Sequence, residues 1–188
     1  KNTPAGYKKE YPWLKEVDSL ALANVQLNLE GAFRKFFREP GVGFPHYKSK
    51  KHSRKSYTTN MVNGNICLQD RFLKLPKMQP VKIKLHRMIP EEWKLKSVTV
   101  SREPSGKYFA VLNIDFEPEP RPNAGGTIGI DVGIKAFYSD SNGNTVSNPR
   151  YLERSMRKLI REQRRLSRKQ KDSHNREKQR IRVARVYE

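Results

Sequence analysis

Cysteine, acidic residues and long apolar runs are all scarce in this chain of 188 residues. The single cysteine, Cys67, excludes a disulfide framework and a cysteine-based zinc site built from these residues alone. No apolar run approaches the roughly 20 residues that a membrane-spanning helix needs, and no signal peptide opens the chain. We therefore expect a cytoplasmic protein without a membrane partner. Because the chain begins with Lys1 and not with Met, we also expect it to be part of something longer.

Positive charge is what the sequence has in excess. Lysine and arginine number 39 against 19 acidic residues, which gives a formal net charge of +20. Apolar residues make up 35% of the chain, enough for a folded core, so a disordered basic tail is excluded. The cations are spread over the whole length and form no single amphipathic cluster, which favours nucleic acid over a membrane surface as the polyanionic partner.

The first part of the chain predicts one helix and one basic loop. Apolar spacing indicates a helix over 14–37, with Asp18 or Ser19 able to cap its start and "EPGVG" ending it. The loop 40–56 then interleaves Phe44, His46 and Tyr47 with lysines and arginines. Aromatic and cationic residues together suit stacking on unpaired bases and contact with their backbone. The alternative, that these aromatics pack into the nearest core, stays open.

The middle of the chain has β character. Asn63-Gly64 between two strand-like runs predicts a type I′ hairpin, and a second hairpin is expected to turn at 104–106. The runs 72–76 and 81–89 alternate apolar and basic residues, so each is expected to bury one face and expose a basic one. Lys82, Lys84 and Arg87 on that exposed face are either phosphate contacts or ordinary solvent-facing residues.

The composition changes at 117–126, "EPEPRPNAGG", which is typical of an interdomain linker and divides the chain into two domains near residue 120. A third hairpin is expected to turn near 142–143. The last segment, 149–188, is predicted to be helical with a break at 171–175. Its apolar residues follow a seven-residue repeat with Gln163 between them: Leu152, Met156, Leu159 and Leu166.

Asp131 stands in the apolar run "TIGIDVGIK" between Gly129 and Gly133. Apolar residues on both sides of it predict a strand buried on both faces, where an ionised carboxylate needs a partner or a metal. Flanking glycines leave room for a close approach to the backbone. Strand, acid, glycine and hairpin in this order is how an RNase H-like nuclease fold begins, in which carboxylates hold Mg²⁺. The alternative is a strand-end aspartate capped by backbone amides.

The helical segment is the strongest candidate for contact with nucleic acid. Residues 148–188 carry 15 lysines and arginines against 5 acidic residues. A solvated coiled-coil face would alternate the sign of its charges, so we favour a basic helical hairpin along a phosphate backbone, with its Leu/Met stripe packed on the sheet. The nucleic-acid candidates of the whole chain are Tyr47, Lys48, Lys50, Lys51, Arg54, Lys55, Tyr57, Lys82, Lys84, Arg87, Arg154, Arg157, Lys158, Arg161, Arg164, Arg165, Arg168, Lys169, Arg176 and Arg180.

Several stretches resemble one family. "GIDVGIK", "NPRYL" and the run from "RRLSRK" through "NREK" to "ARVYE" are similar to the first RuvC motif and following helices of TnpB, the RNA-guided nuclease of bacterial insertion sequences related to compact type V CRISPR effectors. Upstream, "GFPHYKSK" resembles the connection after that family's recognition helix. The resemblance covers nearly the whole chain.

The resemblance implies an α+β architecture. Its parts would be a recognition helix with a basic connecting loop (1–56), a wedge-type antiparallel β-barrel (57–116), a linker (117–126) and the amino-terminal part of a RuvC-like, RNase H-like domain with a basic helical hairpin (127–188). Guide RNA and target DNA are the implied partners. Asp131 corresponds to the first catalytic carboxylate and Mg²⁺ ligand, while the later RuvC carboxylates and a zinc knuckle would lie beyond Glu188.

Because only one of the implied catalytic carboxylates is present, the chain as written is expected to bind nucleic acid without cutting it. The main hypothesis is therefore an RNA-guided DNA endonuclease, or hydrolase, when the protein is intact. Two alternatives remain: a nuclease-inactive RNA-guided DNA-binding protein that acts as a repressor, and a generic RNA-binding protein. Oligomeric state, guide and target-adjacent motif do not follow from the sequence.

Overall fold

The computed structural model describes residues 3–51, 53–90, 92–120, 122 and 125–188. Contacts divide the chain into two compact units: Lys1–Glu103 with Lys107–Glu117, and Pro104–Gly106 with Pro118–Glu188. Helices and small antiparallel sheets occur in both, so the predicted α+β class is confirmed. Among the described residues, no helix is both long and apolar enough to cross a membrane.

The first unit opens with helices α1 (Pro4–Glu10) and α2 (Ser19–Arg38), separated by a short 3-10 helix, η1 (Pro12–Glu16). The helix predicted over 14–37 therefore begins later than expected. It starts at Ser19 because the Asp18 carboxylate accepts a hydrogen bond from Leu20 N at 3.1 Å, which is a helix cap. It ends before Pro40, as predicted.

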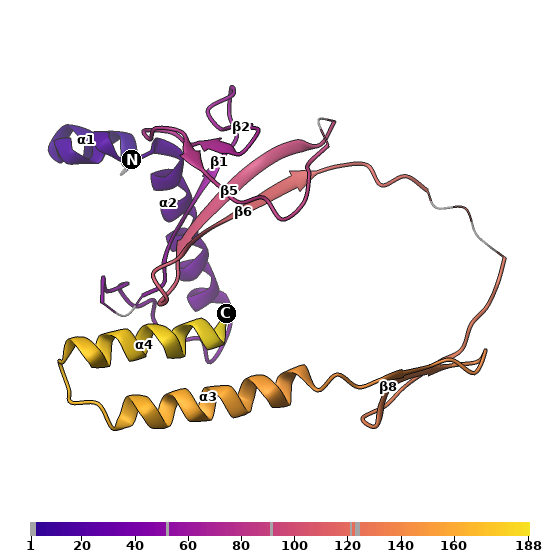
Figure 1. The fold of residues 1–188 in the computed structure, drawn as a ribbon. Coiled ribbons are helices and arrows are strands. Elements are labelled where there is room, and N and C mark those ends of the chain that lie inside the picture. The colour runs from indigo at the N-terminus through magenta and orange to yellow at the C-terminus, as the bar shows by residue number, and fades with distance from the viewer. Residues whose placement is uncertain (1–2, 52, 91, 121, 123–124) are drawn as a thin grey trace. The chain divides into compact units, whose positions relative to one another are not determined.

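A three-stranded antiparallel sheet joins β1 (Lys55–Asn60), β5 (Lys94–Arg102) and β6 (Tyr108–Asp115) in the order β1-β5-β6. The last two strands form the long hairpin of Figure 1, and it turns at 104–106 as predicted. Gly106 has a φ of +86°, a conformation that glycine adopts without strain. Helix α2 is fixed to the edge of this sheet, since Asn24 Nδ2 donates to Thr58 O at 2.8 Å.

A second antiparallel sheet contains β2 (Cys67–Gln69), β3 (Phe72–Lys74) and β4 (Val81–Lys82). Asn63 and Gly64 do take positive φ angles, 51° and 70°, but the predicted hairpin at this turn is wrong. Strand β1 pairs with β5, and β2 pairs with β3. The turn is closed internally instead, because Asn65 Oδ1 accepts from Val62 N at 2.7 Å and its amide donates to Asn60 O at 3.0 Å.

The strand predicted over 81–89 is also shorter than expected, ending at Lys82, since its partner β3 is only three residues long. One core joins the two sheets: Ile66, Leu73, Leu75 and Val98 are buried together. The predicted β-barrel is not closed within the described residues, since the strands of the first unit remain in two separate three-stranded sheets.

In the second unit, β7 (Ile130–Val132), β8 (Ala136–Asp140) and β9 (Thr145–Ser147) form a third antiparallel sheet. Its predicted turn near 142–143 is present, with Gly143 at a φ of +83°. The Asp140 carboxylate closes this turn by accepting from Asn142 N and Asn144 N, both at 2.9 Å. Hydrogen bonds from the Asn144 side chain and backbone lower the pKa of Asp140.

Helices α3 (Tyr151–Ser167) and α4 (His174–Tyr187) complete the second unit as an antiparallel hairpin (Figure 1). The predicted helical segment with a break is confirmed, and the break lies at 168–173, a few residues earlier than expected. Asn148 connects the sheet to α3, because its amide donates to Ile134 O at 2.8 Å and its carbonyl accepts from Arg150 N at 2.9 Å. Before β7, the described residues of 117–126 contain no helix or strand.

Candidate nucleic-acid interface and catalytic carboxylate

Asp131 lies at the centre of β7, opposite Ser139 of β8. The prediction that this strand is buried on both faces is wrong, because Ile130, Val132 and Ile134 are 59%, 71% and 91% exposed. Within the described residues of the second unit, no second layer covers these apolar side chains. Asp131 is itself exposed, so its carboxylate is hydrated and needs no partner to offset burial.

The glycines beside Asp131 have local reasons to be there. A Cβ added at Gly133 would lie 3.3 Å from Ala136 O, so a side chain would crowd the turn between β7 and β8. Gly129 N donates to Ser141 Oγ at 3.2 Å, and a Cβ there would make only ordinary contact with Ser141. Gly133 therefore serves the hairpin itself, and its role does not depend on an approaching ligand.

The described residues do not by themselves fit a Mg²⁺ site. No group of three or more histidine, cysteine, aspartate or glutamate side chains is placed to share a metal ion in the described part of the chain. Asp140 is held by its turn, while Glu153, Glu162 and Glu177 are paired with arginines. The Asp131 carboxylate is exposed and makes no hydrogen bond or ion pair with any described residue.

The hairpin of α3 and α4 is fixed by a buried polar pair. Glu162 and Gln179 are only 7% and 4% exposed. Gln179 Nε2 donates to Glu162 Oε2 at 2.7 Å and to Glu162 O at 3.1 Å. The predicted apolar repeat placed Gln163 on the packed face, but Gln163 is exposed and donates to the Tyr187 hydroxyl at 3.1 Å. Glu162 lies three residues after Leu159 and four before Leu166, so helical spacing places it on the packed face. The sequence analysis missed this signal.

The same pair sets the charge state of Glu162. The hydrogen bond from Gln179 lowers the pKa of this carboxyl most, desolvation by burial raises it, and nearby Arg165, Arg161 and Arg182 lower it further. The net result is a pKa below the ordinary value of 4.5. Arg165 Nη1 lies 2.9 Å from Glu162 Oε1 and Arg161 Nε lies 3.6 Å from it, so one carboxylate orients two arginines.

We expect Glu162→Gln to lower the melting temperature of the α3–α4 hairpin at neutral pH, because the charge partner of two arginines is lost. A depressed folded pKa gives stability that is present above the unfolded pKa and lost as pH falls through the folded pKa. The melting temperature of the wild-type chain should therefore fall more in acid than that of the variant, which lacks this carboxylate. Far-UV circular dichroism melts of both proteins from about pH 7 to about pH 3 measure this. A temperature difference that stays constant across that range would contradict the role of Glu162.

The predicted nucleic-acid contacts on the helices fall into two groups. Some are engaged within the hairpin: Arg157 pairs with Glu153, Arg161 and Arg165 with Glu162, and Arg180 with Glu177, while Arg176 donates to the carbonyls of Leu166 and Lys169. The others form no salt bridge with any described residue: Arg154, Lys158, Arg164, Arg168 and Lys169. All ten of these cationic residues belong to the segment of α3, α4 and their connecting loop.

The apolar stripe of α3 is not packed on the sheet, contrary to the prediction. Leu152 is 77% exposed and Met156 is 48% exposed. Helix α4 packs beside the face that carries Leu159 of this stripe and Glu162, where Val183 is buried. Leu152, Met156 and the apolar side chains of β7 are therefore uncovered within the second unit, whereas Leu159 and Leu166 are half-buried.

In the basic loop, the structure separates two aromatics that the sequence left equal. The Phe44 ring packs edge-on against Phe33 and Phe36 of α2, with centroids 5.5 Å apart in each pair. Tyr47 is fully exposed. The predicted cations beside it, Lys48, Lys50, Lys51, Arg54 and Lys55, are all exposed. Of these, Arg54 pairs with Glu103 at 3.3 Å.

The remaining candidates lie on β1, on β4 and in the segment that follows β4. Tyr57 is half-buried on β1, and its hydroxyl lies 3.7 Å from Met78 Sδ. Burial and the charge of Asp18 raise the pKa of this phenol. Lys82, Lys84 and Arg87 are exposed, and Arg87 Nε donates to His86 Nε2 at 3.0 Å. Tyr57 therefore packs within the first unit, whereas the three cations face solvent.

Comparison with known proteins identifies the family. Residues 97–188 match the OrfB_IS605 family model, described as "Probable transposase". A protein of Streptomyces pristinaespiralis named "Putative RNA-guided DNA endonuclease" is 35% identical over 184 residues, which are 95% of this chain and 44% of the relative. A second, "Putative RNA-guided DNA endonuclease InsQ" of Escherichia coli K12, is 27% identical over 179 residues, 95% of this chain and 43% of the relative. The chain thus spans less than half the length of both relatives. The matched segment contains most of β5, all of β6, Asp131 and the helical hairpin, and this segment belongs to the OrfB_IS605 family, as its resemblance to TnpB indicated.

Proposed function

We propose that this chain is part of an RNA-guided DNA endonuclease of the TnpB type, in which it binds guide RNA and target DNA. The observation that carries the proposal is the alignment, along 95% of the chain, with a relative whose name states this activity. The cations of the α3–α4 hairpin and of the basic loop support it, since a polyanion is the partner that a surplus of +20 attracts.

Each part of the chain has a role in this proposal. Exposed cations hold phosphates without reading sequence, and pairing between guide and target reads the sequence. Tyr47 offers a free aromatic face for an unpaired base. Asp131 supplies one exposed carboxylate to the cleavage site. Since the described residues do not complete a Mg²⁺ site, the remaining ligands must come from outside them.

A guided-cleavage assay on the full-length protein tests this function. The protein is loaded with its co-purified RNA and given a DNA duplex that matches the guide segment, in the presence of Mg²⁺. We expect cleavage of the matched duplex and none of a duplex mismatched at the positions first paired with the guide, because the protein itself reads little sequence. Equal cleavage of both duplexes, or cleavage without RNA, would overturn the guided mechanism.

A nuclease-inactive, RNA-guided DNA-binding protein is the second candidate. It is favoured by one observation, that no cluster of three metal-binding side chains occurs among the described residues. Its expected result in the same assay is guide-dependent retention of the matched duplex without any cut. A product band from the matched duplex therefore decides between the two candidates.

A further inference from the structure

We propose that the loop end of the α3–α4 hairpin holds a binding site for one phosphodiester group of a nucleic acid. The site is a hollow of about 330 Å³ lined by Arg165, Arg168, Lys169, Gln179 and Arg182. This proposal rests on the proposed function, because it assumes that the hairpin meets a nucleic acid. Beyond the proposed function, it names the residues that bind a phosphate and the contacts that fix them in place.

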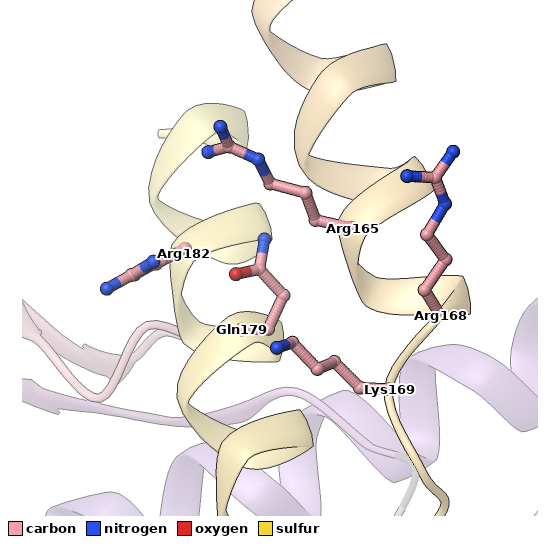
Figure 2. A pocket seen from close by; sticks show the side chains of 5 residues that line it. All are labelled: Arg165, Arg168, Lys169, Gln179 and Arg182. Carbon is pink, nitrogen blue, oxygen red and sulfur yellow. The ribbon is translucent and has the colours of Figure 1, made fainter.

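The side chains that line the hollow come from both helices and from the residues that follow α3. Figure 2 shows Arg165 and Lys169 reaching toward Gln179 of α4, with Arg168 and Arg182 at the edges. Gln179 closes the floor, since it is 4% exposed and bonded to Glu162. Four of the five lining residues are cations, and a small concave site of this charge fits an anion.

Glu162, the carboxylate that contacts two of the lining residues, does not neutralise the site. Glu162 is occupied by Gln179 and by Arg165, whose Nη1 lies 2.9 Å from Glu162 Oε1. A guanidinium has five N–H donors, so Arg165 keeps donors for a second acceptor. Arg168, Lys169 and Arg182 form no salt bridge with any residue that the structure describes. A surplus of positive charge therefore remains at the hollow.

The backbone that carries these cations is held firmly. Arg176 Nη1 donates to Leu166 O and to Lys169 O, both at 3.1 Å. Leu166 O also accepts from Lys169 N at 3.1 Å, so the Arg176 guanidinium adds a further donor and connects the residues after α3 to α4. Ser173 caps α4 by accepting from Arg176 N at 3.1 Å. Arg176 thus serves as a brace for the site, and less ordering entropy is lost when Lys169 and Arg168 close on a phosphate.

Arginine suits this ligand better than lysine would. Its planar guanidinium can donate two parallel hydrogen bonds to the oxygens of one phosphate. Three arginines and one lysine around one hollow can therefore place a phosphate at a fixed point along the hairpin. The remaining exposed cations of α3 would follow the backbone on either side of that point.

The test compares two charge-matched double variants of the chain. Arg168→Gln with Lys169→Gln removes two cations from the hollow, and Lys9→Gln with Lys15→Gln removes two exposed cations of the first unit that are outside all candidate contacts. Affinity is measured by fluorescence anisotropy over a range of salt concentrations. The three probes are single-stranded RNA, duplex DNA and an RNA–DNA duplex, so that the strand supplying the phosphate is identified.

We expect the hollow variant to reduce the slope of log affinity against log salt by about one, and affinity by roughly tenfold near 0.1 M salt, on at least one probe. The Lys9 and Lys15 variant should leave the slope unchanged. Equal slopes for both variants would overturn the phosphate site and leave the proposed function standing, whereas a wild-type chain that binds none of the probes would overturn the proposed function itself. Because Arg168 and Lys169 are exposed, unchanged thermal melts should accompany either result.

Discussion

Asp131→Asn in the full-length protein should lower guided DNA cleavage by at least about 100-fold, the lower end of what one catalytic group contributes, while guide and target binding persist. Asparagine keeps the shape of the side chain and removes its charge. The carboxylate is exposed and makes no hydrogen bond or ion pair with a described residue, so no contact that stabilises the sheet is lost. Single-turnover cleavage and equilibrium binding of the matched duplex measure the two effects separately.

Asp172→Asn is the matched control for that substitution. Asp172 is also exposed, and it lies in the loop between α3 and α4 with a φ of 61°, a conformation that asparagine tolerates. This variant loses the same charge and should cut at the wild-type rate. If the Asp131 variant cleaves as well as the Asp172 variant does, Asp131 has no part in catalysis.

Affinity of the chain for single-stranded RNA is expected to fall by roughly 300-fold to 10⁴-fold between about 50 and 200 mM salt, the range for a protein that neutralises about six to ten phosphates of a single strand. The physical reason is release of the counterions that each phosphate holds. The hairpin segment 148–188 has ten more cations than acidic residues, and the loop from Lys48 to Lys55 adds others. A salt titration followed by anisotropy gives the slope directly, and a change of less than about tenfold would contradict phosphate-dominated binding.

Tyr47→Ala separates stacking from charge in the same titration. Tyr47 is fully exposed, and a base stacked on its ring would contribute about 1–3 kcal/mol. The variant should bind single-stranded RNA more weakly at every salt concentration, with the slope unchanged, because no charge is lost. Binding to duplex DNA, whose bases are already stacked, should stay the same. A parallel loss on both probes would place Tyr47 outside base recognition.

Local patterns predicted the fold where each element is decided by its neighbours in sequence. The cap at Asp18, the turn at 104–106 and the two carboxy-terminal helices all depend on residues within a few positions, and all are present. The Asn63-Gly64 turn also formed, yet its flanking strands pair elsewhere. That pairing is decided by β5, whose ladder with β1 is longer than any that β2 could offer, and no local signal reveals it.

The candidate site divides along the same lines. Sequence located Asp131 and the basic helices, because charge and residue type are visible without a structure. It could not show that the apolar side chains of β7 are exposed among the described residues of the second unit, since the amount of packing around a strand depends on distant segments. It also left Glu162 and Gln179 unnoticed, because their pairing across the hairpin joins residues seventeen positions apart.

The bare sheet of β7, β8 and β9 has a consequence for how this chain behaves at high concentration. Ile130, Val132 and Ile134 present an apolar surface of the kind that drives self-association. Mutual repulsion between copies, each with a net charge of +20, opposes that contact. Salt screens the repulsion, and bound nucleic acid neutralises it. Nucleic-acid binding should therefore lower the colloidal stability of this chain, because the bound polyanion neutralises the charge repulsion that keeps copies of the chain apart.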